Sequence, residues 1–309
     1  MERKNAWSKY PEGKKRDKVF AFAEEYRQFI SNAKTERECT TFFEEEAKKA
    51  GFKDLEELIR KGKKLKAGDK VYRTNHKKAI ALFIIGSEAL EKGINILGAH
   101  IDSPRMDLKQ NPLYEDSGLV LLDTHYYGGI KKYQWVALPM ALHGVVALKS
   151  GKVIEVTIGE KGTDPVVGVS DLLIHLAGEQ MQKKGDKVVE GEDLNVLVGS
   201  MPPVKNDDTK LSDDDIKDNH TDKEPVKKAI LALLKSEYGI EEEDFQSAEL
   251  CVVPAGPARD YGFDRSMIMG YGHDDRVCAY PSYRALQEVK NPEYTCVCLL
   301  VDKEEIGSV

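Results

Sequence analysis

The sequence predicts an α/β domain that is interrupted by a β-rich insertion. Two helical patterns and then several apolar, strand-like runs open the chain, which is the order expected of an α/β sheet. From residue 108 the pattern changes to short apolar runs separated by glycine turns, and from residue 267 the α/β pattern returns. We therefore expect one α/β domain built from residues 1–107 and 250–309, with residues 108–249 inserted between its two parts.

The first part contains two helical patterns and three strand patterns. Apolar side chains recur at helical spacing over residues 18–33, and Thr35 with Glu38 forms a capping box that begins a second helix, which Gly51 ends. A short helical turn is expected next. The expected strands are residues 70–74, 79–85 and 94–99. We expect the last to be buried, and the last two, both strongly apolar, to be adjacent in the sheet.

The insertion and the final part follow the same local signals. Ser150 and Gly151 lie between two apolar runs and predict a hairpin turn. The acidic residues 206–224 contain few large apolar side chains and are expected to form a loop. The other expected elements are helices over residues 169–183, 225–238 and 277–289 and an apolar strand over residues 294–301.

Composition excludes several classes of protein. The formal net charge is −7, whereas nucleic acids and anionic membranes are bound by basic surfaces. No apolar run approaches the ~20 residues of a membrane-spanning helix, and phosphate-binding glycine loops and the serine-hydrolase elbow are absent from the sequence. The five cysteines form no Cys-x-x-Cys pair, so we expect buried thiols in a reducing compartment. These features predict a cytoplasmic protein that binds neither nucleic acid nor membranes.

Three segments place metal-binding or proton-moving side chains next to apolar runs. The first, NILGAHIDSPRMD, contains His100 at the end of an expected strand, where open α/β sheets place their ligands. Asp102 lies two residues further on and points the same way in an extended chain, so it is expected to reach the imidazole and fix its tautomer. The other segments are GHDDR, residues 272–276, and DKEEIGSV, residues 302–309.

Together these segments predict a metal centre. Imidazole nitrogen and carboxylate oxygen bind zinc and similar ions, and the candidates are His100, Asp274 or Asp275, and Glu304 or Glu305. A carboxylate can bind two ions, and two ions ~4 Å apart clamp an attacking water. One glutamate would then be a ligand while the other accepts the proton of the water. Acidic pairs are usually solvated, but these adjoin apolar segments, unlike the other acidic runs of the chain.

In their order along the chain, the segments AHIDSPR, GHDDRVCAYPSYRAL and DKEEIGS resemble the aspartyl aminopeptidase and aminopeptidase I family of dinuclear zinc metallopeptidases. The resemblance covers essentially the whole chain. It implies a zinc-peptidase-like α/β sandwich domain in which the β-rich insertion is a dimerisation domain. It also implies a hydrolase that removes single residues from the N-termini of peptides and assembles into a homo-oligomer, a tetrahedral dodecamer.

The resemblance further implies a role for each candidate residue. His100 and Glu305 would be zinc ligands, and Asp274 would bridge two zinc ions. Asp102 would orient His100, and Glu304 would be the general base. Cobalt or manganese would suit the same nitrogen and oxygen ligands.

The C-terminus departs from the family pattern. Family chains are longer and supply a further Asp ligand and a final His ligand after the Glu-Glu segment, whereas this chain stops at Val309. We therefore expect a partial metal centre and, if the strand over residues 294–301 is central, an exposed apolar surface through which the chain associates. The alternative to a metalloaminopeptidase is a catalytically incomplete fragment or an assembly subunit that binds full-length relatives.

The insertion carries one further candidate. In the family, a His of the insertion reaches the metal site of a neighbouring subunit and stabilises the tetrahedral intermediate. His175, in the segment VSDLLIHLAGE, is the candidate for this role here, and Asp171 is the alternative in that register. The competing interpretation of His175 is a helical residue that faces a core.

Overall fold

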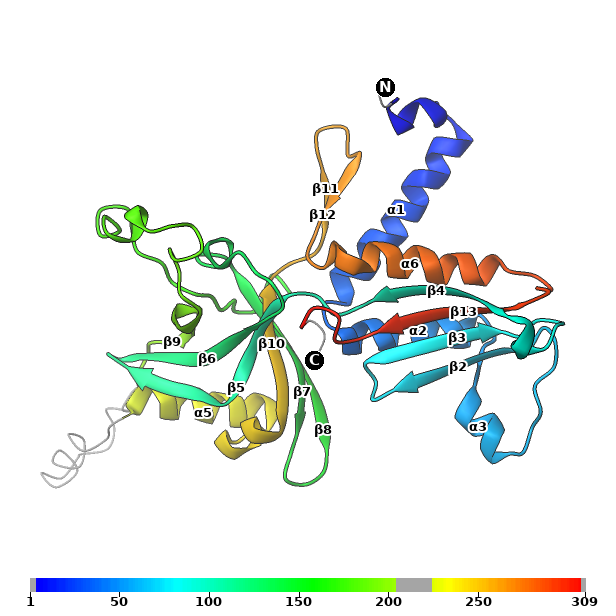
Figure 1. The fold of residues 1–309 in the computed structure, drawn as a ribbon. Helices are drawn as coiled ribbons and strands as arrows, with labels where there is room; N and C mark the ends of the chain where they lie inside the picture. The colour runs from blue at the N-terminus through cyan, green and yellow to red at the C-terminus, as the bar shows by residue number, and fades with distance from the viewer. Residues whose placement is uncertain (1–3, 204–223, 307–309) are drawn as a thin grey trace, which may run out of the picture. The chain divides into compact units, whose positions relative to one another are not determined.

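The computed structural model describes residues 4–203 and 224–306. The chain divides into two compact units, the first made from Met1–Ser103 and Pro257–Val309 and the second from Pro104–Gly256. The second unit is thus an insertion in the first (Figure 1). The changes of domain expected at 107/108 and 249/250 differ from these boundaries by a few residues. The acidic loop expected over residues 206–224 lies, apart from Glu224, outside the described residues.

Helix α2 of the first unit begins where the sequence signals it, whereas α1 and α6 each begin four residues before the predicted start. The Thr35 hydroxyl accepts a hydrogen bond from the Glu38 N–H, and the Glu38 carboxylate accepts one from the Thr35 N–H, so the capping box is confirmed. This arrangement satisfies two N–H groups that the helix leaves unpaired at its start. The helices are α1 (Lys14–Asn32), α2 (Glu36–Lys49), α3 (Leu55–Arg60) and α6 (His273–Glu288).

The main sheet of the first unit has five strands in the order β1-β2-β3-β13-β4. These strands are β1 (Lys53–Asp54), β2 (Lys70–Asn75), β3 (Ala79–Ile84), β13 (Thr295–Val301) and β4 (Ile94–His100). β3 is antiparallel to both β2 and β13, whereas β13 and β4 are parallel. The prediction that the strands over residues 79–85 and 94–99 are adjacent is therefore wrong, because β13 lies between β3 and β4. A separate two-stranded sheet is formed by β11 (Arg259–Tyr261) and β12 (Met267–Met269).

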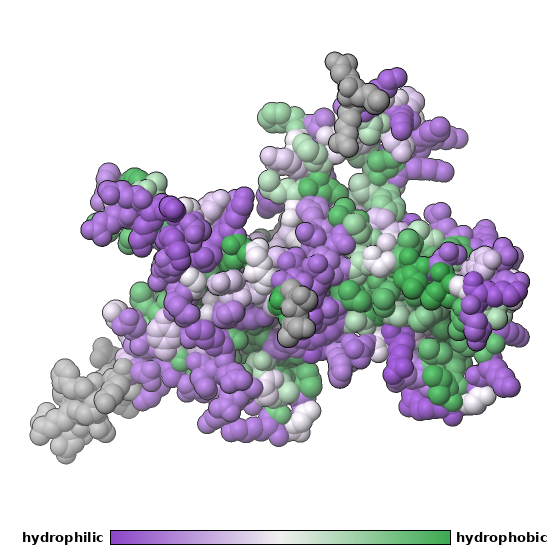
Figure 2. Space-filling view, viewed as in Figure 1, coloured by the Kyte–Doolittle hydropathy of each residue, from purple (hydrophilic) through white to green (hydrophobic). Residues whose placement is uncertain are grey.

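The prediction that β4 is buried is also wrong. Among the described residues β4 pairs only with β13, so it is an edge strand. Ile94, Ile96 and Leu97 are exposed, Ile96 to 54%. Burial of a strand needs partners on both edges and cover on both faces, and β4 has one paired edge. Figure 2 shows hydrophobic atoms gathered on the surface of this unit.

The core of the first unit is formed by helices α1, α2 and α6 on one face of the sheet. Its aromatic centre is Phe29, Phe43, Tyr280 and Tyr283, with ring centroids 5.0 to 5.4 Å apart in the pairs that touch. Strand residues with period two complete it, among them Leu82 of β3 and, from β13, Cys298 and Leu300. β13 is a central strand, and alternate side chains of it are buried. It therefore holds in place the start of the segment that contains Glu304 and Glu305.

The second unit is an antiparallel sheet with the strand order β8-β7-β10-β5-β6-β9. The predicted hairpin turn at Ser150 and Gly151 is confirmed, because it connects β7 to β8 and Gly151 has a φ of 81°. Helix α5 (Pro225–Tyr238) is also as predicted and ends at Gly239 in the left-handed conformation. The strands are β5 (Arg105–Asp116), β6 (Leu119–Tyr127), β7 (Met140–Ala147), β8 (Val153–Ile158), β9 (Val196–Gly199) and β10 (Ala248–Pro254).

The helix predicted over residues 169–183 is not formed. Turns and one short 3-10 helix, Gln180–Gln182, occupy this range. Leu172, Leu173, Ile174 and Leu176 are all exposed. In a helix these consecutive apolar residues would lie on all sides instead of forming one stripe, and such a helix needs cover all round.

The five cysteines are free, and they divide by burial. Cys39, Cys251 and Cys298 are buried, as predicted, but Cys278 is exposed and Cys296 is half-buried. Burial raises the pKa of the Cys39 and Cys298 thiols to about 12. No helix in the described part of the chain has the length and hydropathy needed to cross a membrane.

Candidate metal centre

The site is built where two parallel strands of the first unit end. β4 ends at His100, and in the register of the sheet Val301 of β13 lies opposite it. Parallel strands end at the same edge of a sheet, so the residues that follow β13 are brought to the imidazole. Glu304 and Glu305 are the third and fourth residues after Val301.

The acids of GHDDR approach from the start of α6. Asp274 and Asp275 are joined by a cis peptide bond, and their backbone angles are not helical. The Ser103 hydroxyl donates a 2.8 Å hydrogen bond to the Asp274 carbonyl, which ties this turn to the chain just after β4. The Asp274 carboxylate then lies with Oδ1 3.2 Å from His100 Nε2.

Three of the predicted ligands form one cluster. A ligand atom from each of His100, Asp274 and Glu305 lies within 4.8 Å of the other two. We call these residues the His-Asp-Glu cluster. One imidazole nitrogen and two carboxylates are the donors that zinc, manganese or cobalt binds, so the residues fit a metal ion. Of the alternatives that the sequence left open, Asp274 and Glu305 are the ones found in this cluster.

Asp102 connects His100 to the backbone of Glu304 and Glu305. Its side chain is fully buried, and its two carboxylate oxygens accept hydrogen bonds from the backbone N–H groups of Glu304, at 3.4 Å, and Glu305, at 3.2 Å. His100 Nδ1 lies 3.0 Å from the Asp102 backbone carbonyl and 3.4 Å from its carboxylate. Since a carbonyl only accepts, Nδ1 carries a proton, and Nε2 is the ring nitrogen available to a metal ion. The predicted tautomer is thus held mainly by the carbonyl of Asp102.

Glu304 lies beside the cluster. Its side chain is 61% exposed, and Oε2 is 3.6 Å from His100 Nε2. Asp275 is outside the cluster, and its carboxylate raises the pKa of the Cys278 thiol. In each of the adjacent pairs Asp274-Asp275 and Glu304-Glu305, one carboxylate therefore belongs to the cluster and the other does not.

The neighbouring acids change the protonation of the cluster. Burial lowers the pKa of His100, but the hydrogen bond to the Asp102 carbonyl and the negative charges of Asp102 and Glu304 outweigh it, so the pKa is raised overall. Burial raises the pKa of Glu305, and the nearby Asp274 adds to this against the opposing effect of His100. A site that gathers negative charge around one imidazole favours a bound cation.

Sequence reasoning missed Arg276, which anchors the acidic turn. Its guanidinium is buried, with Nε donating to the Ile101 carbonyl at 3.1 Å and Nη2 donating to the Lys34 carbonyl at 2.7 Å. Arg276 thereby joins α6 to the residue after His100 and to the chain between α1 and α2. An Arg directly after two acids is a weak signal, because its partners are backbone carbonyls, which no side-chain pattern marks.

The predicted residue of the insertion is located in the second unit. His175 lies in a turn and is exposed, so the interpretation of a helical His facing a core is wrong. The alternative in that register, Asp171, accepts hydrogen bonds from the Leu172 N–H and from the Gln180 side chain.

The amino-acid sequence is similar to those of known aminopeptidases. A sequence model of the M18 family, described as aminopeptidase I zinc metalloprotease, matches residues 29–309. A probable M18 family aminopeptidase 1 of Clostridium acetobutylicum is 56% identical over 308 residues, which is all of this chain and 63% of that protein. This chain therefore spans about 63% of the length of that relative.

Solved structures show the same fold. The crystal structure of aminopeptidase I from Clostridium acetobutylicum superposes with a TM-score of 0.86 at 53% identity, covering all of this chain and 64% of that one. The S. cerevisiae mApe1 dodecamer, at 22% identity, has a TM-score of 0.67 over 94% of this chain and 63% of that one. The family match and the fold agree, and this chain belongs to the M18 family of aminopeptidase I zinc metalloproteases.

Proposed function

We propose that the protein is a metalloaminopeptidase that hydrolyses the N-terminal residue from peptides with a zinc-activated water. The observation that supports this most directly is the His-Asp-Glu cluster, in which an imidazole and two carboxylates converge within 4.8 Å at the end of two parallel strands. Family membership supplies the reaction class, and the residues of the cluster supply donors for the metal.

Two zinc ions are proposed as the cofactor, with cobalt or manganese as substitutes. His100 and Glu305 would each contribute a ligand, and Asp274 would bridge through its two carboxylate oxygens. When bound, zinc would polarise the scissile carbonyl and lower the pKa of the attacking water. Asp102 acts as a positioning residue, because it presents the Nε2 lone pair of His100 and holds the backbone of the Glu-Glu segment.

Glu304 is proposed as the general base. It adjoins the cluster without belonging to it, so its carboxylate stays available for a proton. It would accept a proton from the attacking water and pass it to the leaving amine, which is how a general base becomes a general acid in peptide hydrolysis. Its exposure is consistent with access for water and a peptide.

We also propose that the enzyme is cytoplasmic and that it forms a homo-oligomer. This would be a dodecamer like that of mApe1. The second unit would be the dimerisation domain. The exposed run from Leu172 to Leu176 supports this, because contiguous exposed apolar residues mark interaction surfaces. His175, in the middle of that exposed run, would reach the site of a neighbouring subunit and stabilise the tetrahedral intermediate.

The proposal is tested by metal content and hydrolysis together. The purified protein and its His100→Ala variant would be compared by elemental analysis, and a panel of aminoacyl substrates would give the preferred N-terminal residue. We expect His100→Ala to lose metal at one position while its circular dichroism spectrum is unchanged. Unchanged metal stoichiometry would refute the ligand assignment. Metal binding without hydrolysis of any substrate, by this chain or by a longer form of it, would favour a non-catalytic assembly subunit.

A further inference from the structure

A second site lies at the opposite edge of the same sheet. A cavity of about 550 Å³ is formed by β1, α3, the start of β2 and the loop that joins α3 to β2. Two strands, β3 and β13, separate β2 from β4, so this cavity is distinct from the His-Asp-Glu cluster. Its charged lining consists of Lys53, Lys63, Lys64, Lys66, Lys70 and Asp69, and we call it the lysine cavity.

The loop that supplies these lysines is held in place. Asp69 Oδ2 accepts a 2.9 Å hydrogen bond from the Lys66 N–H, so the one acid of the lining is used by the backbone. The Gly68 N–H donates to the Ile85 carbonyl at 2.8 Å, and the Ile85 N–H donates to the Asp69 carbonyl at 2.9 Å. The Lys63 N–H donates to the Leu58 carbonyl at 3.0 Å. Both ends of the loop are therefore tied to regular elements.

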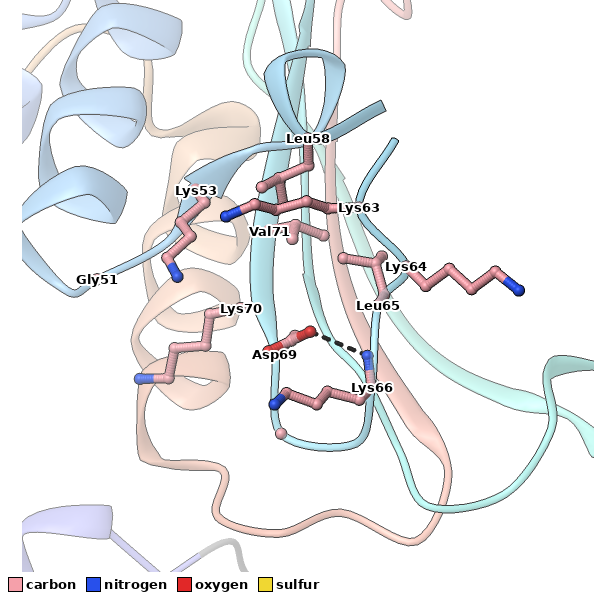
Figure 3. Close-up of a pocket in the computed structure, with 11 residues that line it drawn as sticks. Gly51, Lys53, Leu58, Lys63, Lys64, Leu65, Lys66, Asp69, Lys70 and Val71 are labelled. Carbon is pink, nitrogen blue, oxygen red and sulfur yellow. Dashed lines mark hydrogen bonds between the residues drawn. The ribbon is translucent and has the colours of Figure 1, made fainter. Parts of the chain in front are cut away.

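Four of the lysines extend to the same side of the loop, and one does not. Figure 3 shows the side chains of Lys53, Lys63, Lys66 and Lys70 extending to one side of the loop, whereas Lys64 extends to the other. Within residues 4–203 and 224–306, no carboxylate forms an ion pair with the ammonium groups of these four lysines. The ammonium group of Lys70 lies 5.4 Å from the centroid of the Phe52 ring.

Two other lysines of the first unit, unlike these four, are paired with carboxylates. Lys61, just before the loop, pairs with Glu57, and Lys48 pairs with Glu44 at 2.6 Å. The chain as a whole has a net charge of −7. Four positive charges around one cavity repel one another, and a multivalent anion would relieve that repulsion at a single point.

We propose that the lysine cavity binds a small anion that carries two or more phosphate groups. Ammonium groups are compact point charges that bind phosphate, whereas flat carboxylates are matched best by the fork of arginine, and no arginine lines the cavity. The cavity has the size of a small-molecule site. Leu58, Leu65 and Val71 also line it and offer apolar contact to an organic portion of the ligand.

Inorganic tripolyphosphate is the probe for this site. Isothermal titration calorimetry of the purified chain is expected to show one saturable site whose affinity falls as salt is raised. The Lys53→Ala/Lys66→Ala double variant should weaken binding several-fold, up to about 25-fold, since each exposed ion pair contributes up to about fivefold. Lys77→Ala is the matched control, because this exposed lysine of the same unit does not line the cavity, and it should bind like the unchanged protein.

Each other result contradicts the proposal. Absence of saturable binding, or an equal loss in Lys77→Ala, would show only non-specific attraction to lysines. Loss of the signal in His100→Ala would show that tripolyphosphate binds at the metal centre. Tighter binding of hexaglutamate than of tripolyphosphate would reassign the cavity to acidic peptides. Lys63→Glu provides a second variant, whose fold is checked by circular dichroism, and it should abolish binding of the probe.

Discussion

β13 and β4 are parallel neighbours in one sheet and lead to Glu305 and His100 of the His-Asp-Glu cluster, but β13 is more buried than β4. Cys298 and Leu300 of β13 are fully buried, whereas Ile96 of β4 is 54% exposed. The cluster therefore does not depend on burial of both strands. What positions His100 is the hydrogen bonding just after β4, in which Asp102 and Ser103 tie its end to the Glu-Glu segment and to α6.

The largest effects, on turnover and on metal binding, are expected for the two glutamates that follow β13. Glu304→Gln should retain metal and, in a preparation with peptidase activity, lower turnover by ~10²–10⁴, because a general base is removed. Glu305→Gln should lose metal, because an uncharged amide replaces a ligand in the cluster. Elemental analysis and kinetics on both variants check this. Reversed phenotypes would mean that base and ligand have been exchanged.

The next effect concerns the anchor of the acidic turn. Arg276→Ala should lower the free energy of unfolding by about 2–5 kcal/mol, because it leaves a cavity and takes the donors from the Ile101 and Lys34 carbonyls. Arg284→Ala on the same helix is the control, since Arg284 forms a partly exposed pair with Glu25 and should cost about 1 kcal/mol or less. Urea unfolding measures both. Equal costs would show that Arg276 has no special part in holding the turn.

The contrast between the two strands can be measured directly by truncation. Leu300→Ala in β13 should cost about 2–5 kcal/mol of unfolding free energy, because Leu300 is fully enclosed by the helices. Ile96→Ala in β4 should cost about 0.5 kcal/mol or less, because its side chain is already largely in water. A similar cost at both positions would mean that β4 is covered in solution.

The sequence was informative where function lies at the ends of apolar runs. The proximity of His100, Asp274 and Glu305 could be predicted because each follows or precedes an apolar segment, and such segments end at sheet edges. The order of the strands could not be predicted, because β13, the pairing partner of β4, lies about two hundred residues further along the chain.

Other features depend on contacts that local patterns do not encode. The partners of Arg276 are backbone carbonyls, which look alike in every sequence. The apolar residues from Leu172 to Leu176 suggested a helix, but a helix forms only when something covers its apolar side, and in the described residues they remain exposed. No local pattern indicates that the lysines between Gly62 and Gly68 line one cavity together with Lys53 and Lys70, because the fold brings these segments side by side.

The smallest change in the free energy of unfolding is expected at the open edge of the sheet. A substitution there should instead alter self-association of the chain. Among the described residues β4 has one unpaired edge, and its exposed Ile94, Ile96 and Leu97 make this edge a template for pairing with another chain. Ile96→Lys should change the free energy of unfolding by about 0.5 kcal/mol or less, because the side chain stays in water. It should nevertheless reduce self-association of the 309-residue chain in sedimentation velocity, because a lysine on an edge strand opposes a second strand. Lys92→Ala, close by but outside the strand, is the control and should associate like the unchanged chain. If Ile96→Lys associates as strongly as the control, the edge of β4 is not the surface through which copies meet.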